Sequence, residues 1–225
     1  MAEVNLLNSI PRIARDVGAR LIDKEENRRL AMKFGWEYFD GPREQGYGGY
    51  RYDGRWVAVA HRIINHFGLK PGDRVLDIGC AKGFLVKDLA DALPGLEVWG
   101  MDVSSYALEN AHPDARTRLL GGSCDRLPFA DGSFTVALAI NSIHNLDRDG
   151  CLMALREMQR VAPRGGFVQV DAYRSETERL LLEDWMLTAR TYLDPEGWKA
   201  MLSEAGYFGD WYWTILEADP AFIRR

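Results

Sequence analysis

The chain has 225 residues, with 28 Lys and Arg against 33 Asp and Glu, so its formal net charge is −5 at pH 7. A mildly acidic chain without a basic block lacks the charge footprint of a nucleic-acid-binding protein. The sequence contains no run of 18 apolar residues, and its first residues lack the basic-then-apolar pattern of a secretory signal. These features predict no membrane partner and no secretory signal. We therefore expect a cytoplasmic α/β protein. Its three widely spaced cysteines (Cys80, Cys124 and Cys151) predict neither a disulfide framework nor a metal site.

The first 56 residues predict an arm that precedes the main domain, which we place at residues 57–225. Residues 1 to about 33 read as helical with mixed charge, and a solvated helical face is favoured over a binding surface. Residues 34–56 are dense in aromatic residues and glycines, a composition that fits neither a regular helix nor an alternating strand. We expect this segment to be a packed loop.

A strand, a tight loop and a helix are predicted at residues 74–89, after a helix at residues 56–67. The small residues Gly79, Ala81 and Gly83 let the loop backbone approach a ligand, and the helix start behind them offers free N–H groups. Asp77 ends the strand and points toward the same crevice. Together with Cys80, these residues predict a nucleotide-type binding site.

The spacing of this loop distinguishes two classes of cofactor. Dinucleotide dehydrogenases require Gly-x-Gly-x-x-Gly or Ala, but counting from Gly79 that last position is Phe84. The sequence Val75–Gly83 instead resembles the first motif of class I S-adenosylmethionine-dependent methyltransferases, with Ala81 in place of the middle glycine. A tight connection in some other α/β protein is the alternative.

The resemblance, which covers roughly residues 57–217, implies a Rossmann-like fold and a cofactor. The expected fold is an open, mostly parallel seven-stranded sheet with helices on both faces and an antiparallel last strand, here a hairpin within residues 210–217. The expected cofactor is S-adenosylmethionine, with S-adenosylhomocysteine as product.

A second acid follows the second predicted strand. Asp102, beside Val103, lies where a carboxylate can accept both hydroxyl hydrogens of an adenosine ribose. The alternative is that Asp102 caps the helix expected at residues 105–111. The loop at residues 119–134 resembles the family's adenine-contacting loop, with Ser123 where an acid is usual. The resemblance thus assigns adenine contacts to the backbone of Ser123 and Cys124, and to Asp125.

Polar residues also follow the fourth and fifth predicted strands, at the sheet edge that faces a ligand. Asn141 is expected to contact the cofactor. His144 is a candidate general base, because its ordinary pKa is near neutrality. Its alternatives are a helix cap or a cofactor contact. At the next strand end, Asp171 is a second catalytic candidate and Tyr173 a candidate substrate contact. Because Ala172 follows Asp171, no metal is invoked.

The resemblance further implies that the aromatic segment covers the cofactor and the substrate. This makes Tyr47, Tyr50, Arg51 and Arg55 candidate lid residues. An aromatic face of the lid could contact the sulfonium of the cofactor, or one of the arginines could bind a carboxylate. Alternatively, they only anchor the arm on the domain. In the C-terminal part, a helix at residues 175–191 and another capped by Asp194 with Pro195 at its first position are predicted.

The sequence thus predicts a methyltransferase acting on a small molecule, at a hydroxyl or an amine of a metabolite or sugar. The alternatives are a non-catalytic S-adenosylmethionine-binding module, a protein methyltransferase and an NAD-dependent oxidoreductase. Neither the methyl acceptor nor the oligomeric state follows from these patterns.

Overall fold

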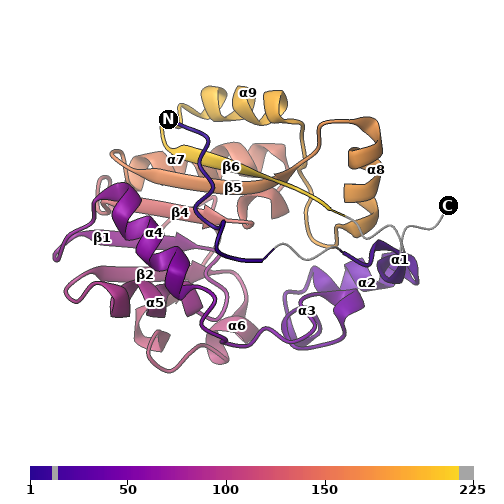
Figure 1. Cartoon of the computed structure of the whole chain (residues 1–225), viewed down its shortest axis with the longest axis horizontal. Helices are drawn as coiled ribbons and strands as arrows, with labels where there is room; N and C mark the ends of the chain where they lie inside the picture. The colour runs from indigo at the N-terminus through magenta and orange to yellow at the C-terminus, as the bar shows by residue number, and fades with distance from the viewer. Residues whose placement is uncertain (12–14, 218–225) are drawn as a thin grey trace.

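A computed structural model describes residues 1–11 and 15–217 of the chain. Its centre is a six-stranded sheet in the order β3-β2-β1-β4-β5-β6, with every neighbouring pair parallel (Figure 1). The predicted Rossmann-like class is confirmed. The strands are β1 Arg74–Ile78, β2 Glu97–Asp102, β3 Leu119–Gly121, β4 Val136–Ile140, β5 Gly166–Ala172 and β6 Asp210–Ile215.

The expected seventh strand and antiparallel last strand are wrong for the described chain. Residues 210–215 form one strand, β6, which pairs in parallel with β5 from Phe167 opposite Asp210 to Ala172 opposite Ile215. The connection between the two strands contains α8 (Glu176–Trp185) and α9 (Pro195–Ala205), long enough for a crossover that returns the chain in the same direction. A hairpin would have required a turn within residues 210–217, but residues 210–215 form one continuous strand.

Helices cover both faces of the sheet because each presents an apolar stripe to it. On one face, α4 (Val57–Phe67) and α5 (Phe84–Ala92) bury side chains in a core with β1 and β2. On the other, α7 (Arg148–Val161) and α9 pack in a second core. Within α7 the buried residues follow a helical period, and they include Cys151, Ala154, Leu155 and Met158.

The smaller elements lie along the edges and in the arm. The helices are α1 Val17–Leu21, α2 Lys24–Ala31, α3 Trp36–Phe39 and α6 Ser105–Glu109. Single-turn 3-10 helices occur at η1 Arg43–Gln45, η2 Arg116–Arg118 and η3 Ile143–Asn145. The helix predicted at residues 175–191 ends earlier, at Trp185, whereas the predicted cap of α9 is confirmed because Asp194 accepts a hydrogen bond from the Gly197 N–H at 2.7 Å.

The strand order reverses between β1 and β4, which opens a crevice at their carboxyl ends. The loops that follow the two strands touch there. Ser142 Oγ donates to the Ile78 carbonyl at 2.8 Å, and a Cβ on Gly79 would lie 2.3 Å from the Ser142 Cβ. Glycine at position 79 is therefore required by the close approach of the two loops.

The first residues of the chain complete the edge of the sheet beside β6, which the sequence did not predict. The Val4 N–H donates to the Trp211 carbonyl at 2.9 Å, and the Trp211 N–H donates to the Ala2 carbonyl at 3.1 Å. Leu6 is then buried in the core beneath α4. Figure 1 shows this N-terminal segment crossing in front of the sheet.

Three basic residues of the arm bind the carboxyl end of α8. Arg20 Nη1 donates to a backbone carbonyl at 3.0 Å, Arg28 Nη1 to another at 3.3 Å, and Lys24 Nζ to a third, all within residues 184–186. The last carbonyls of a helix lack partners within it and carry partial negative charge, so cations stabilise them. The predicted solvated face is therefore wrong for Arg20, which is buried, and right for Arg29, which is exposed.

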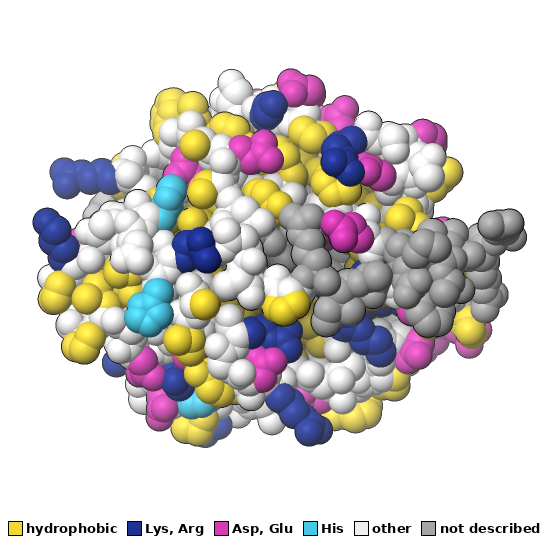
Figure 2. All heavy atoms as spheres, viewed as in Figure 1, with side chains coloured by type: hydrophobic (Ala, Val, Ile, Leu, Met, Phe, Trp, Pro, Cys, Tyr) yellow, Lys and Arg dark blue, Asp and Glu magenta, His cyan; other side chains and the backbone are white. Residues whose placement is uncertain are grey.

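The outer surface shows charges of both signs. On the described part of the face in Figure 2, Lys and Arg side chains are interspersed with Asp and Glu and form no continuous basic patch. Across the described residues, every helix is too short or too polar to cross a lipid bilayer.

Candidate functional site

The loop after β1 has the left-handed backbone that the small residues predict. Gly79, Ala81 and Gly83 have φ values of 79°, 51° and 73°. The N–H groups of Gly79 and Cys80 donate to the Met101 carbonyl at 2.7 and 3.1 Å, which joins the loop to the end of β2. Alanine in this conformation is strained, so the contacts around the loop must hold it.

Asp102, at the end of β2, supplies one of those contacts. Its Oδ2 accepts the Ala81 N–H at 2.7 Å and its Oδ1 accepts the Ser104 N–H at 2.8 Å. The alternative role as a helix cap is wrong, because Ser104 caps α6 and accepts the Ala107 N–H at 2.9 Å. Burial raises the pKa of Asp102. A carboxylate has about four lone-pair sites, so two hydrogen bonds leave room for a ligand.

Asp77, at the end of β1, is a buried acid of a different kind. It is 4% exposed, and no residue in the described ranges donates a hydrogen bond to its carboxylate. Burial, and then the nearby Asp102, raise the pKa of Asp77 to about 7. An ionised carboxylate in such surroundings favours a cationic partner.

Two adjoining cavities, of about 240 and 470 Å³, meet at this loop. Their walls share Tyr47, Gly79, Ala81 and Asn141. The smaller cavity is lined by residues that include Phe34, Tyr38, Phe39, Met101, Asp102, Val103, Gly122, Ser123, Cys124, Ser142 and Asn145. The larger is lined by residues that include Asn5, Asn8, Arg15, Tyr50, Arg55, Trp56, Asp77, Cys80, Leu85, Ile140, Gln169, Tyr212 and Thr214.

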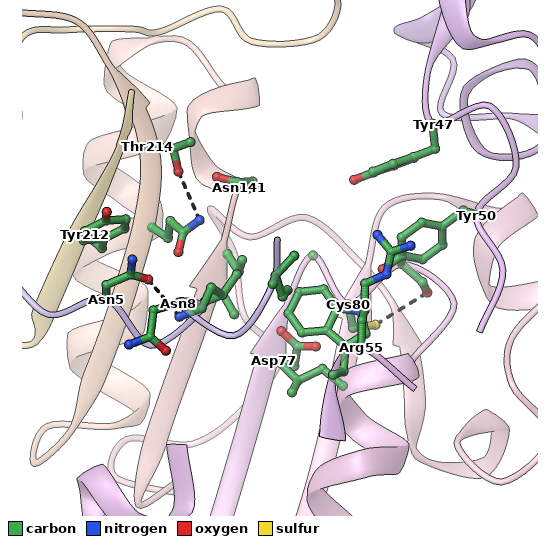
Figure 3. A pocket seen from close by; sticks show the side chains of 18 of the residues that line it. Asn5, Asn8, Tyr47, Tyr50, Arg55, Asp77, Cys80, Asn141, Tyr212 and Thr214 are labelled. Atoms are coloured by element: carbon green, nitrogen blue, oxygen red, sulfur yellow. Dashed lines mark hydrogen bonds between the residues drawn. The ribbon is translucent and has the colours of Figure 1, made fainter. Parts of the chain in front are cut away.

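The two ends of the larger cavity differ in chemistry. Figure 3 places Tyr47, Tyr50 and Arg55 on one side, and Asn5, Asn8, Tyr212 and Thr214 on the other, with Asp77 and Cys80 near the loop. One end is therefore aromatic and the other is rich in amides and hydroxyls.

The aromatic segment of the arm is fastened to the glycine loop. Lys82 Nζ, from within that loop, contacts both oxygens of Asp40 at 2.8 and 2.6 Å, and the Tyr106 hydroxyl donates to Asp40 at 2.7 Å. Tyr50 stacks on Phe84 with ring centroids 4.9 Å apart. These contacts hold the aromatic segment beside the glycine loop, where Tyr47 and Tyr50 line the larger cavity.

The structure brings most predicted site residues to the cavity walls. The predicted residues that line one cavity or both are Asp77, Gly79, Cys80, Ala81, Asp102, Val103, Ser123, Cys124, Asn141, Tyr47, Tyr50 and Arg55. Gly83 is instead the N-cap residue of α5, and a Cβ there would lie 2.8 Å from the Ala115 Cβ. Asp125, Arg51 and Tyr173 are not among the lining residues.

His144 and Asp171 form a pair beside the crevice. His144 Nδ1 accepts the Asp171 N–H at 3.3 Å and lies 3.8 Å from the Asp171 carboxylate. The His144 carbonyl accepts the N–H groups of Arg190 and Thr191. His144 is 4% exposed, burial lowers its pKa, and neither member of the pair lines the two cavities. The pair joins the loop after β4 to β5.

Sequence reasoning missed the amide and hydroxyl residues of the larger cavity. Gln169 carried a signal, because an amide in the middle of a buried apolar strand needs hydrogen-bond partners. Asn5, Asn8 and Thr214 carried none, since only the folded chain brings the N-terminal segment beside β6.

The comparisons agree with this geometry. Residues 75–166 match the model of a family described as a methyltransferase domain. A malonyl-[acyl-carrier protein] O-methyltransferase of Legionella pneumophila is 33% identical over 116 residues, covering 50% of this chain and 40% of that protein. The ubiquinone/menaquinone biosynthesis C-methyltransferase UbiE of Syntrophotalea carbinolica is 33% identical over 135 residues, covering 57% and 54%. The chain thus spans about half the length of these relatives.

Residues 75–166 thus form a methyltransferase domain, and its relatives support the class I S-adenosylmethionine-dependent type. S-Adenosylmethionine is the cofactor of such a domain. Solved structures share its fold. A putative methyltransferase from Bacillus halodurans matches with a TM-score of 0.52 at 20% identity, covering 65% of this chain and 68% of that one. The [4+2]-cyclase SpnF matches with a TM-score of 0.52 at 22% identity, covering 67% and 56%.

The residues of the methyltransferase domain fit this cofactor. Asp102 offers carboxylate lone pairs for ribose hydroxyls beside the smaller, partly aromatic cavity. Asp77 offers a buried negative charge without a partner among the described residues, and the methionine end of the cofactor is positively charged at its sulfonium and ammonium groups. No group of three or more metal-ligating side chains occurs within the described ranges.

Proposed function

We propose that this protein transfers the methyl group of S-adenosylmethionine to a small molecule held in the larger cavity. The observation that carries the proposal is the meeting of the two cavities at Gly79, Ala81 and Asn141. One compartment has the features for an adenosine, and the other leaves about 470 Å³ on the far side of the same loop. A donor and a methyl acceptor could therefore meet beside it.

The bound cofactor supplies an activated methyl group on a sulfonium. The protein then has to align a lone pair of the methyl acceptor with that group and exclude water. In this proposal the lid, through Tyr47 and Tyr50, closes the aromatic side of the cavity, and the buried Leu6 anchors the N-terminal segment that closes the other.

Calorimetric titration with S-adenosylmethionine, S-adenosylhomocysteine and NAD tests the first half of the proposal. We expect binding of the first two in the micromolar range and no binding of NAD, because Phe84 takes the position of the third small residue of a dinucleotide loop. Incubation with radiolabelled S-adenosylmethionine and a panel of metabolites then tests transfer. Binding of NAD alone would overturn the proposal, and cofactor binding with no transfer to any small molecule would favour a binding module or a protein methyltransferase.

His144 is the general base suggested by the sequence, and its place in the structure favours positioning instead. We propose that it holds the loop of Asn141 against β5 through its bond to the Asp171 N–H. His144→Gln should then keep turnover within about tenfold of the wild type, because an amide can accept the same hydrogen bond. Losses on the order of a hundredfold or more in both His144→Gln and His144→Ala, with a changed pH–rate profile and unchanged cofactor affinity, would instead show general-base catalysis.

A further inference from the structure

We propose that the methyl acceptor is an uncharged, hydroxylated molecule, and that one of its hydroxyl groups hydrogen-bonds to both Gln169 and Thr214. The inference rests on the proposed methyl transfer and specifies the class of molecule that enters the larger cavity. It begins from an atom in the wall of that cavity that has no hydrogen-bond partner among the described residues.

That atom is Oε1 of Gln169. The residue lies in the middle of β5, is 5% exposed and lines the larger cavity. Its Nε2 donates to Thr214 Oγ1 at 3.0 Å, whereas its Oε1 is buried and receives no hydrogen bond from the described chain. Buried amide oxygens are normally satisfied. A ligand hydrogen-bond donor would satisfy this one.

Thr214 supplies the complementary half of the site. Its hydroxyl oxygen already accepts a hydrogen bond from Gln169, so its own proton is available for donation. A hydrogen-bond acceptor on Gln169 and a donor on Thr214 therefore stand next to each other on neighbouring strands. A ligand hydroxyl can donate to the first and accept from the second. An unprotonated carboxylate or phosphate oxygen only accepts, and it would leave Gln169 Oε1 unpaired.

The rest of this end of the cavity is neutral and polar. Figure 3 shows the amides of Asn5 and Asn8 beside Tyr212 and Thr214. Asn5 Oδ1 accepts the Leu7 N–H at 3.0 Å, which fixes the side chain and leaves its NH₂ group for other hydrogen bonds. Amide groups both donate and accept, so they suit a molecule with several hydroxyls.

The charges of the two arginines in the wall are each offset or held by other residues of the chain. The Arg55 guanidinium is paired with both oxygens of Asp53, at 2.9 and 2.8 Å from its Nε. Figure 3 places Arg55 on the side of the cavity opposite Thr214. The Arg15 guanidinium lies 5.5 Å from the ring centroid of Trp185, and its charge is offset by Asp171, which lies opposite Thr214 in the sheet. Neither arrangement singles out an anionic methyl acceptor.

Radiolabelled methyl transfer to two matched sets of compounds tests the proposal. One set contains neutral glycosides and polyols, and the other contains the corresponding uronic acids and sugar phosphates. We expect transfer to members of the neutral set. For an active compound, Gln169→Leu and Thr214→Val should each lower kcat/KM at least tenfold, while the affinity for S-adenosylmethionine, measured by calorimetry, stays within twofold.

A matched control variant distinguishes the loss of the proposed hydrogen bonds to the methyl acceptor from a general loss of stability. Gln159→Leu makes the same replacement in α7, where the side chain bonds Pro163 and Phe208 outside the cavity, and it should leave kcat/KM unchanged. Transfer confined to the anionic set, transfer to neither set by a protein that binds S-adenosylmethionine, or full activity in both cavity variants would overturn the inference. Absence of cofactor binding by the wild type would instead overturn the proposed function.

Discussion

Replacement of Asp102 by alanine is expected to weaken the binding of S-adenosylmethionine at least tenfold, about 1.4 kcal/mol. Two effects add in the same direction. The variant loses the carboxylate proposed to bind the ribose hydroxyls, and it loses the hydrogen bond that holds Ala81 in its left-handed conformation. Calorimetric titration with S-adenosylmethionine measures the change, and circular dichroism confirms that the variant is folded.

A second Asp102 variant separates these two effects. Asp102→Asn keeps one side-chain oxygen for the Ala81 N–H but can no longer accept from both ribose hydroxyls. We expect its affinity to lie between those of the wild type and Asp102→Ala. The exposed Asp114, replaced by alanine, is the control for the change in net charge. Wild-type affinity in folded Asp102→Ala would remove the ribose assignment.

Asp77→Asn is expected to change stability and cofactor affinity in opposite directions. Because the pKa of Asp77 is raised to about 7, the folded state holds its proton more tightly than the unfolded chain does. The contribution of this group to the free energy of unfolding is therefore largest below pH 3.8 and is lost progressively as the pH rises from there to about 7. Without cofactor, Asp77→Asn should stabilise the protein at pH 8 by on the order of 4 kcal/mol, and at pH 5 by less, on the order of 1 to 2 kcal/mol.

The same substitution should weaken the binding of S-adenosylmethionine at least tenfold at pH 8, since the amide cannot balance a positive charge. For the wild type, affinity should rise between pH 6 and pH 8 as Asp77 ionises, whereas the affinity of the variant should stay nearly constant over that range. Urea unfolding and calorimetry at both pH values provide the measurements. Equal pH dependence in both proteins would show that the cation does not bind at Asp77.

The prediction of the fold succeeded where local patterns determine it. The run Arg74–Phe84 contains a buried strand, small residues and the start of a helix, and all three form where expected. The end of the sheet could not be predicted in this way. Whether residues 210–217 form one strand or two depends on how the chain returns from α9 and on what pairs with β6, and β6 pairs with β5 and the N-terminal segment.

The same distinction applies to the site. Residues at the ends of predicted parallel strands, such as Asp77, Asp102 and Asn141, reached the cavity because every such strand ends at the same edge. Asn5 and Thr214 meet only through tertiary structure. The role of Arg20 was missed for a related reason, because a charge pattern alone does not show which helix end lies opposite the residue.

Pairing between the N-terminal segment and β6 also bears on the order of folding. The Ala2 N–H donates to the Asp210 carboxylate across 208 positions of sequence. Contacts that close loops of this size form slowly, and during synthesis the N-terminal segment leaves the ribosome long before its partner strand exists. The wall of the larger cavity that contains Asn5 and Asn8 should thus be the last part of the binding site to assemble, after the glycine loop and the core beneath it.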